Sequence, residues 1–179
     1  PTLPGYIAIT TIILAILYLA YIAATPAIES VVSSNTMPSD WSHYWRAEWI
    51  PRFGISLEFG MDGVSFLMVG LTLLLGLIAI SSSWSEIDFK PGLFQANILW
   101  TLAGVCGVFL ALDLFLFFLF WEVMLIPMYL LIAVWGHEKK AYAAMKFFIF
   151  TQVSGLLMLL SIVILATQAA EISGQWSFS

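Results

Sequence analysis

The stretch FFLFWEVMLIPMYLL, Phe117 to Leu131, holds one charged side chain, Glu122, among apolar or nearly apolar neighbours. The segment around it, Leu114–Trp135, is long enough to cross a hydrocarbon core about 30 Å thick, which takes about 20 residues at helical rise. A charged acid at the bilayer centre costs about 2.5–3.5 kcal/mol on insertion scales. Glu122 therefore has to face protein or water, and its carboxyl group has to be protonated or paired.

The composition of the whole chain indicates that lipid is its solvent. Of its 179 residues, 61% are hydrophobic and only 9% are charged, and the mean hydropathy is +0.99. A soluble domain has about a quarter of its residues charged. The net charge of −5 argues against a nucleic-acid partner, which requires a basic surface. Cys106 is the only cysteine, which excludes an intrachain disulfide and a four-cysteine metal or cluster site built from this chain alone.

Five segments are long and apolar enough to be membrane-spanning helices, which lipid favours because it offers the backbone no hydrogen-bond partner. The fold class predicted is an all-α polytopic membrane protein, with residues 1–179 as a single membrane domain. The expected spans are Tyr6–Ala24, Val64–Ser83, Leu93–Leu112, Leu114–Trp135 and Tyr142–Ala170. A first residue of Pro1 indicates a processed, truncated or incomplete chain. The first span lacks the basic flank of a signal peptide.

The loops between the spans differ in length and charge. Residues 84–92 and 136–141 are short and carry Lys90, Lys139 and Lys140, whereas residues 26–62 form a long acidic loop. With five spans, the two lysine loops fall on one side of the membrane and the long loop on the other. The positive-inside rule predicts that the lysine loops are cytoplasmic and that loop 26–62 is periplasmic.

The long loop carries two patterns. Aromatic residues at helix-like spacing follow Asp40, a plausible helix cap; they are Trp41, Tyr44, Trp45 and Trp49. Further on, Ile55–Phe59 alternates like a strand between two glycines. Two interpretations remain open: a folded cap over the helix ends, or a docking element for a neighbouring subunit.

Glu122 is the first candidate for chemistry. It lies 13 residues from Trp135, about 20 Å along a helix and close to mid-membrane. Burial favours the neutral form of a carboxyl group and a nearby cation favours the charged form, so such a group can load and release a proton. Pro127 cannot donate to the carbonyl of Val123 and predicts a kink beside the acid. The competing interpretation is a neutral glutamate hydrogen-bonded to a neighbouring helix.

Three further side chains are candidates for a proton relay. Tyr129 lies two turns from Glu122 on the same helical face. Lys146 is the one candidate for a membrane-embedded cation, about 8 Å from the inner loop, with snorkelling to the surface as the alternative. Gln152 is a polar residue in the last span. The small and flexible side chains on that span's shared face predict helix packing; they are Thr151, Ser154, Gly155 and Met158.

Four stretches of the chain resemble the subunit M, or NADH dehydrogenase subunit 4, type of bacterial NADH:quinone oxidoreductase, respiratory complex I. They are WIPRFGIS (Trp49–Ser56), MDGVSFLMV (Met61–Val69), VFLALDLFLFFLFWEVMLIPMYLLIAVWGH (Val108–His137) and KFFIFTQVSGLLMLL (Lys146–Leu160). The resemblance covers nearly the whole chain. It implies an antiporter-like membrane-arm subunit of about fourteen helices, of which the chain looks like the second through sixth.

The resemblance also implies roles for residues and partners. Glu122 would be the proton-carrying acid, paired with a lysine on a discontinuous seventh helix beyond Ser179, while Asp62 and Pro127 would be structural. No Gly-rich phosphate loop and no cluster of metal ligands is found in the sequence, so no cofactor or metal is expected in this chain. NADH, FMN, iron–sulfur clusters and quinone are expected in partner subunits. Other complex I membrane-arm subunits would be its neighbours, in the bacterial inner membrane.

Rival interpretations come from proteins that are similar to the same family. One is the D-type subunit of a multisubunit sodium/proton antiporter, and another is a membrane subunit of an energy-converting hydrogenase. A third is a structural spacer in which Glu122 is inert. The details of WIPRFGIS and WEVMLIPMY favour complex I.

Overall fold

The computed structural model describes residues 3–24, 43–50 and 55–173. Within them the chain forms five helices and one pair of strands. In chain order the elements are α1 (Leu3–Ala24), β1 (His43–Ile50), β2 (Ile55–Met61), α2 (Gly63–Ser82), α3 (Pro91–Leu110), α4 (Leu114–Trp135) and α5 (Lys140–Ser173). All five helices are long and apolar enough to cross a membrane. The predicted fold class, an all-α polytopic membrane protein, is confirmed in its five helices, and the structure adds one pair of strands.

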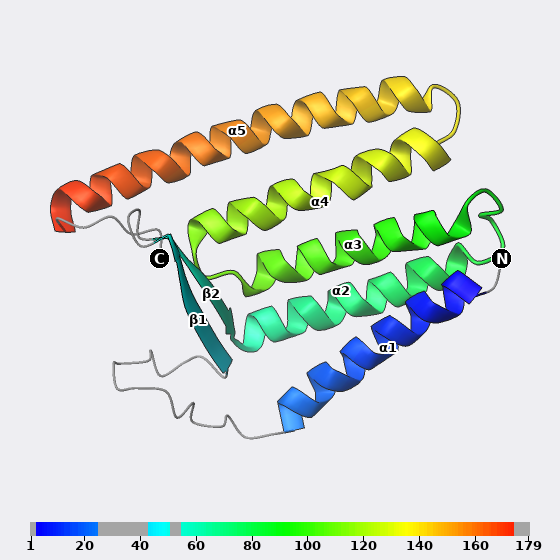
Figure 1. Ribbon diagram of the computed structural model, residues 1–179, viewed down its shortest axis with the longest axis horizontal. Helices are drawn as coiled ribbons and strands as arrows, with labels where there is room; N and C mark the ends of the chain where they lie inside the picture. The colour runs from blue at the N-terminus through cyan, green and yellow to red at the C-terminus, as the bar shows by residue number, and fades with distance from the viewer. Residues whose placement is uncertain (1–2, 25–42, 51–54, 174–179) are drawn as a thin grey trace.

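The helices pack side by side in an order that follows the chain (Figure 1). Helix α3 packs between α2 and α4, α5 packs along α4, and α1 lies against α2 and α3. The α3–α4 contact is close because α3 presents glycines to it: a Cβ at Gly107 would overlap the ring of Phe120. Apolar side chains such as Leu67 and Leu157 point outward and are more than half exposed, as lipid-facing residues would be.

Helix α5 is longer than the sequence predicts and begins two residues earlier. Its 34 residues extend about 51 Å at helical rise, well beyond a hydrocarbon core of about 30 Å. The C-terminal part of the helix has a partner there, because Ile162 and Ala166 are buried against Ile55 of β2. The strands thus hold the end of α5 as well as the ends of α3 and α4.

The strands form an antiparallel hairpin at one end of the helices (Figure 1). Strand β2 agrees with the prediction for Ile55–Phe59. The helix predicted around Tyr44, Trp45 and Trp49 is wrong, because these residues lie on β1. A spacing of four fits one helical turn and also two strand repeats, and pairing with β2 selects the strand. Asp40 and Trp41 lie outside the described residues.

The loop residues that carry the lysines lie at the opposite end from the hairpin (Figure 1). The indole nitrogen of Trp135 donates to the carbonyl of Phe89 at 2.8 Å and so joins the two short loops. Lys90 and Lys139 adopt left-handed backbone conformations at the helix starts, with φ of 47° and 60°. The prediction that both lysine loops lie on one side therefore agrees with the arrangement of the helices.

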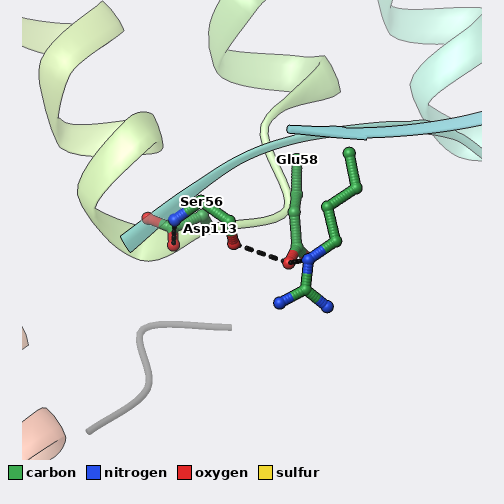
Figure 2. A network of polar contacts seen from close by, with 4 residues as sticks. Ser56, Glu58 and Asp113 are labelled. Carbon is green, nitrogen blue, oxygen red and sulfur yellow. Dashed lines mark hydrogen bonds and ion pairs between the residues drawn. The ribbon is translucent and has the colours of Figure 1, made fainter. Parts of the chain in front are cut away.

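A buried carboxylate, Asp113, connects the hairpin to the turn between α3 and α4 (Figure 2). Its Oδ1 accepts hydrogen bonds from the backbone N–H groups of Phe115 and Leu116 at 2.8 and 3.0 Å, which caps α4. Its Oδ2 lies 3.4 Å from the backbone nitrogen of Ser56 on β2. One carboxylate therefore satisfies helix donors and a strand donor together.

The hairpin adds a second acid to this network. The hydroxyl of Ser56 donates to Glu58 at 2.6 Å, and Arg46 pairs with the same carboxylate oxygen at 3.0 Å. The backbone of Glu58 also accepts from the N–H of Leu112 at 3.0 Å. Glu58 is buried while Arg46 is half exposed, so the guanidinium forms the exposed end of the network.

Replacing Asp113 with alanine is expected to lower the free energy of unfolding by about 2–3 kcal/mol, since it removes a helix cap and leaves buried N–H groups without an acceptor. Asp113→Asn keeps one acceptor oxygen and should lose clearly less. Circular dichroism during SDS titration of the detergent-solubilised chain measures both. Equal losses in the two variants would mean that the charge, and not the acceptor, stabilises the turn.

Candidate functional site

Glu122 lies inside α4, eight residues from Leu114 and 13 from Trp135. At helical rise these separations are about 12 and 20 Å, which places the acid well away from both helix ends. Its side chain is half-buried and points toward α5, because the carboxyl group contacts Gln152 and Gly155 there. The acid thus faces protein, as the cost of exposing it to hydrocarbon requires.

The two oxygens of the Glu122 carboxyl group have different surroundings. Oε2 accepts a hydrogen bond from the side-chain amide of Gln152 at 3.0 Å. Oε1 is buried and has no hydrogen-bond partner among the described residues. A carboxyl group of this kind is half satisfied. It is held in place through one oxygen, and the other remains available to a proton or an incoming donor.

Gln152 is the relay candidate that the structure brings to the acid. It lies on α5 and is half-buried at the α4–α5 contact. An amide N–H stabilises a charged carboxylate and can equally be accepted by the carbonyl oxygen of a neutral acid. Gln152 can therefore remain bound to Glu122 in both protonation states.

Tyr129 and Pro127 lie on the same helix as the acid but contact other groups. The Tyr129 ring packs edge-on against Phe148 of α5, with ring centroids 5.7 Å apart. It lies two turns, about 10 Å, from Glu122 along α4, too far for a direct hydrogen bond. Pro127 is fully buried, and α4 continues through it from Leu114 to Trp135. Pro127 has no N–H to donate to the Val123 carbonyl one turn earlier, close to the acid.

Lys146 is not brought to Glu122. It is exposed, and its ammonium group lies 5.9 Å from the centre of the Tyr142 ring. Six residues separate Lys146 from Gln152 on α5, which is about 9 Å along the axis and about 120° around it. Lys146 and Gln152 therefore face different sides of α5, and the geometry agrees with the snorkelling alternative.

Asp62, predicted to be structural, caps α2. Its Oδ1 accepts from the backbone N–H of Ser65 at 2.7 Å. Hydrogen bonds from the side chain and backbone of Ser65 lower the pKa of the Asp62 carboxyl group below 3.8. The cap therefore carries a negative charge at neutral pH, close to the positive end of the helix dipole.

One feature of the site was not predicted. Gly155 was interpreted as a packing residue, but its closest contact is the carboxyl group of Glu122, whereas Ser154 of the same expected face is exposed. The sequence offered only a weak signal for this contact, namely a glycine three residues after a glutamine on the same helical face.

Comparison with known proteins finds similar membrane subunits. The profile of the family described as "NADH:quinone oxidoreductase/Mrp antiporter, TM" matches residues 111–175, which include Glu122 and Gln152. NADH-quinone oxidoreductase subunit M of Pseudomonas aeruginosa is 49% identical over 168 residues, which is 90% of this chain and 33% of that protein. The segment that carries α4 and most of α5 thus matches this antiporter-like family, and the chain is similar to subunit M over most of its own length.

Solved structures are similar to the chain over nearly its whole length. A chain of respiratory complex I from Thermus thermophilus with bound NADH matches with a TM-score of 0.77 and 26% identity, over 98% of this chain and 33% of that one. A chain of the Mrp complex from Dietzia sp. DQ12-45-1b matches with a TM-score of 0.73 at 20% identity, over 96% of this chain and 17% of that one, which shows the shared fold. The chain spans about a third of the length of the curated relatives it matches.

Removing the donor to Glu122 should be visible in its infrared spectrum. In Gln152→Leu, the C=O stretching band of protonated Glu122 is expected to move to higher wavenumber, because an accepted hydrogen bond is lost. Lys146→Met should leave the band in place, because Lys146 faces another side of α5. Difference spectra assign the band by its loss in Glu122→Gln. A shift in the lysine variant alone would contradict the arrangement.

Proposed function

We propose that the chain forms part of a proton-translocating, antiporter-like membrane subunit of an NADH:quinone oxidoreductase, respiratory complex I. The observation that carries the proposal is the half-satisfied carboxyl group of Glu122 between α4 and α5, far from both ends of α4. Membrane-buried ionisable groups of this kind are functional by default, because their burial is costly. The 49% identity to a protein named NADH-quinone oxidoreductase subunit M supports the same conclusion.

The proton-transfer step follows from the two carboxyl oxygens. In the neutral state one Glu122 oxygen carries the proton and Gln152 donates to the other. When a cation approaches, it favours the carboxylate; the O–H bond then breaks and the proton passes to an acceptor in the pathway. When the cation withdraws, the carboxylate takes up another proton. Energy from quinone reduction elsewhere in the complex would set the position of the cation.

The cation is expected from outside the five helices. Lys146 is exposed and faces away from Glu122, and Lys90, Lys139 and Lys140 lie at the loop end of the helices. This supports a partner on a helix beyond this chain, as the resemblance to complex I implies. Neighbouring antiporter-like subunits would complete the membrane arm, and the redox cofactors NADH, FMN, iron–sulfur clusters and quinone are expected in partner subunits.

Sodium/proton exchange is the second candidate. The family description names the Mrp antiporter together with NADH:quinone oxidoreductase, and one buried acid serves either activity. The identity to subunit M favours complex I. Neighbouring genes for NADH-binding subunits, as opposed to small antiporter subunits, would distinguish the two.

Glu122→Gln tests the proposal in the assembled complex. Because a positioned acid or base contributes about 10²–10⁴ in rate, proton pumping is expected to fall at least tenfold. Dye quenching in inside-out vesicles during NADH oxidation measures it, and gel analysis checks assembly. Glu138→Gln, a change at an exposed loop acid, should leave pumping unchanged. Normal pumping in Glu122→Gln would remove the assignment.

We also propose that the lysine loops face the cytoplasm and the hairpin faces the periplasm. Three lysines gather at the loop end, whereas Arg46 at the hairpin end is paired with Glu58. Two exposed glutamates give a matched pair of probes, Glu138→Cys and Glu48→Cys. A membrane-impermeant maleimide should label Glu138→Cys only in inside-out vesicles and Glu48→Cys only in right-side-out spheroplasts. The reverse pattern would invert the orientation.

A further inference from the structure

Gly155 lies on α5 against the unpartnered oxygen of Glu122. A Cβ built at Gly155 would overlap Oε1 of the glutamate, and the rest of the carboxyl group lies just behind it. Gly155 is buried, so this is an internal contact of the α4–α5 pair. Glycine in a helix interior costs about 1 kcal/mol relative to alanine. The space it leaves is here filled by the carboxyl group.

Gly155 and Gln152 act on the same carboxyl group from one helical face. They are three residues apart, so they lie about 60° apart around α5 and about 4.5 Å along it. Gln152 donates to Oε2 and Gly155 gives room to Oε1. Together they fix the direction in which the carboxyl group points.

This arrangement makes the two oxygens chemically different. An oxygen that accepts an N–H bond is suited to be the carbonyl oxygen of a neutral acid, so the proton belongs on the other oxygen. Gln152 occupies Oε2, and Oε1 has no partner among the described residues. The arrangement therefore favours Oε1, the oxygen that lies against Gly155, as the atom that carries the proton.

We propose that Gly155 is a positioning residue for Glu122: its missing side chain lets Gln152 hold Oε2 while Oε1 lies against the α5 backbone as the atom that exchanges the proton. The inference rests on the proposed function of Glu122. In this arrangement, residues of α5 orient the proton-carrying glutamate, which lies on α4.

Gly155→Ala tests the inference, because the methyl group must displace the carboxyl group from Gln152. In the assembled complex, proton pumping is expected to fall by on the order of tenfold to a hundredfold, the range reached when a reacting group is misplaced by about 1 Å. The infrared C=O band of Glu122 should move to higher wavenumber. Gly70→Ala is the matched control, since a Cβ at Gly70 of α2 would meet only Leu19, at an ordinary 3.6 Å. It should change neither readout.

A double-mutant cycle separates positioning from general packing. Glu122→Asp shortens the side chain by one C–C bond, about 1.5 Å, which withdraws the carboxyl group from the space that the methyl group fills. Gly155→Ala should therefore lower pumping in the Glu122 protein and have no further effect in Glu122→Asp. An equal fold-loss in both backgrounds would overturn the inference.

The same set of variants also tests whether the complex assembles and whether Glu122 carries the proton. If Gly155→Ala alone does not assemble, the double variant should assemble, because the overlap is gone; failure of both would also overturn the inference. Normal pumping in Glu122→Gln would instead remove the proposed function. A third outcome is that Glu122→Gln loses pumping while Gly155→Ala pumps as well as Gly70→Ala. That result would leave the proposed function in place and remove only the role of Gly155.

Discussion

Hydrocarbon gives a carboxyl group no partner, and this constraint determines how α4 and α5 pack. The insertion cost of about 2.5–3.5 kcal/mol for a charged acid has to be offset inside the protein. Gln152 supplies a hydrogen bond and Gly155 supplies the space for the group to lie between the helices. A rotation of α5 by 100°, one residue position, would replace both, with Val153 and Leu156 in one direction or with Thr151 and Ser154 in the other. Only the observed register of the two helices brings Gln152 and Gly155 to the acid.

Two acids lie along α4, Asp113 at its N-cap and Glu122 in its interior, and their hydrogen-bond surroundings differ. Asp113 at its start is fully buried, and its oxygens accept from backbone groups of α4 and β2. Every donor there is fixed, so the carboxylate has nothing to exchange and acts as a structural cap. Glu122, about 14 Å further along the helix, receives one side-chain donor and keeps one oxygen open. The two carboxyl groups therefore differ in the donors around them, and the proposed proton carrier is the one that keeps an oxygen without a partner among the described residues.

Hydropathy predicted the five spans because membrane insertion selects length and apolarity, both of which can be read locally. The alternation of apolar and polar side chains predicted the strand at Ile55–Phe59, because this pattern too can be read from a short stretch of sequence. The aromatic residues Tyr44, Trp45 and Trp49 were wrongly predicted to form a helix, because a spacing of four residues fits a helix and a strand alike. Only the pairing with β2 selects the strand. The contact of Gln152 with Glu122 could not be predicted, because the level at which two helices meet depends on loop lengths and packing that no local pattern records. Gly155 illustrates this limit, since its closest contact is with Glu122, 33 positions earlier in the chain.

The position of Lys146 has a consequence for how the acid is controlled. A lysine fixed beside Glu122 would hold the carboxylate charged and prevent reprotonation, because a permanent cation favours one state only. With Lys146 exposed beside Tyr142 and turned about 120° from Gln152, the α4–α5 pair holds Glu122 without a fixed counter-charge in the described residues. The partner held permanently is Gln152, a neutral amide that is compatible with both protonation states. Under the proposed function, such a site would respond to a cation that approaches and withdraws, and the movement of that cation would set the direction of proton transfer.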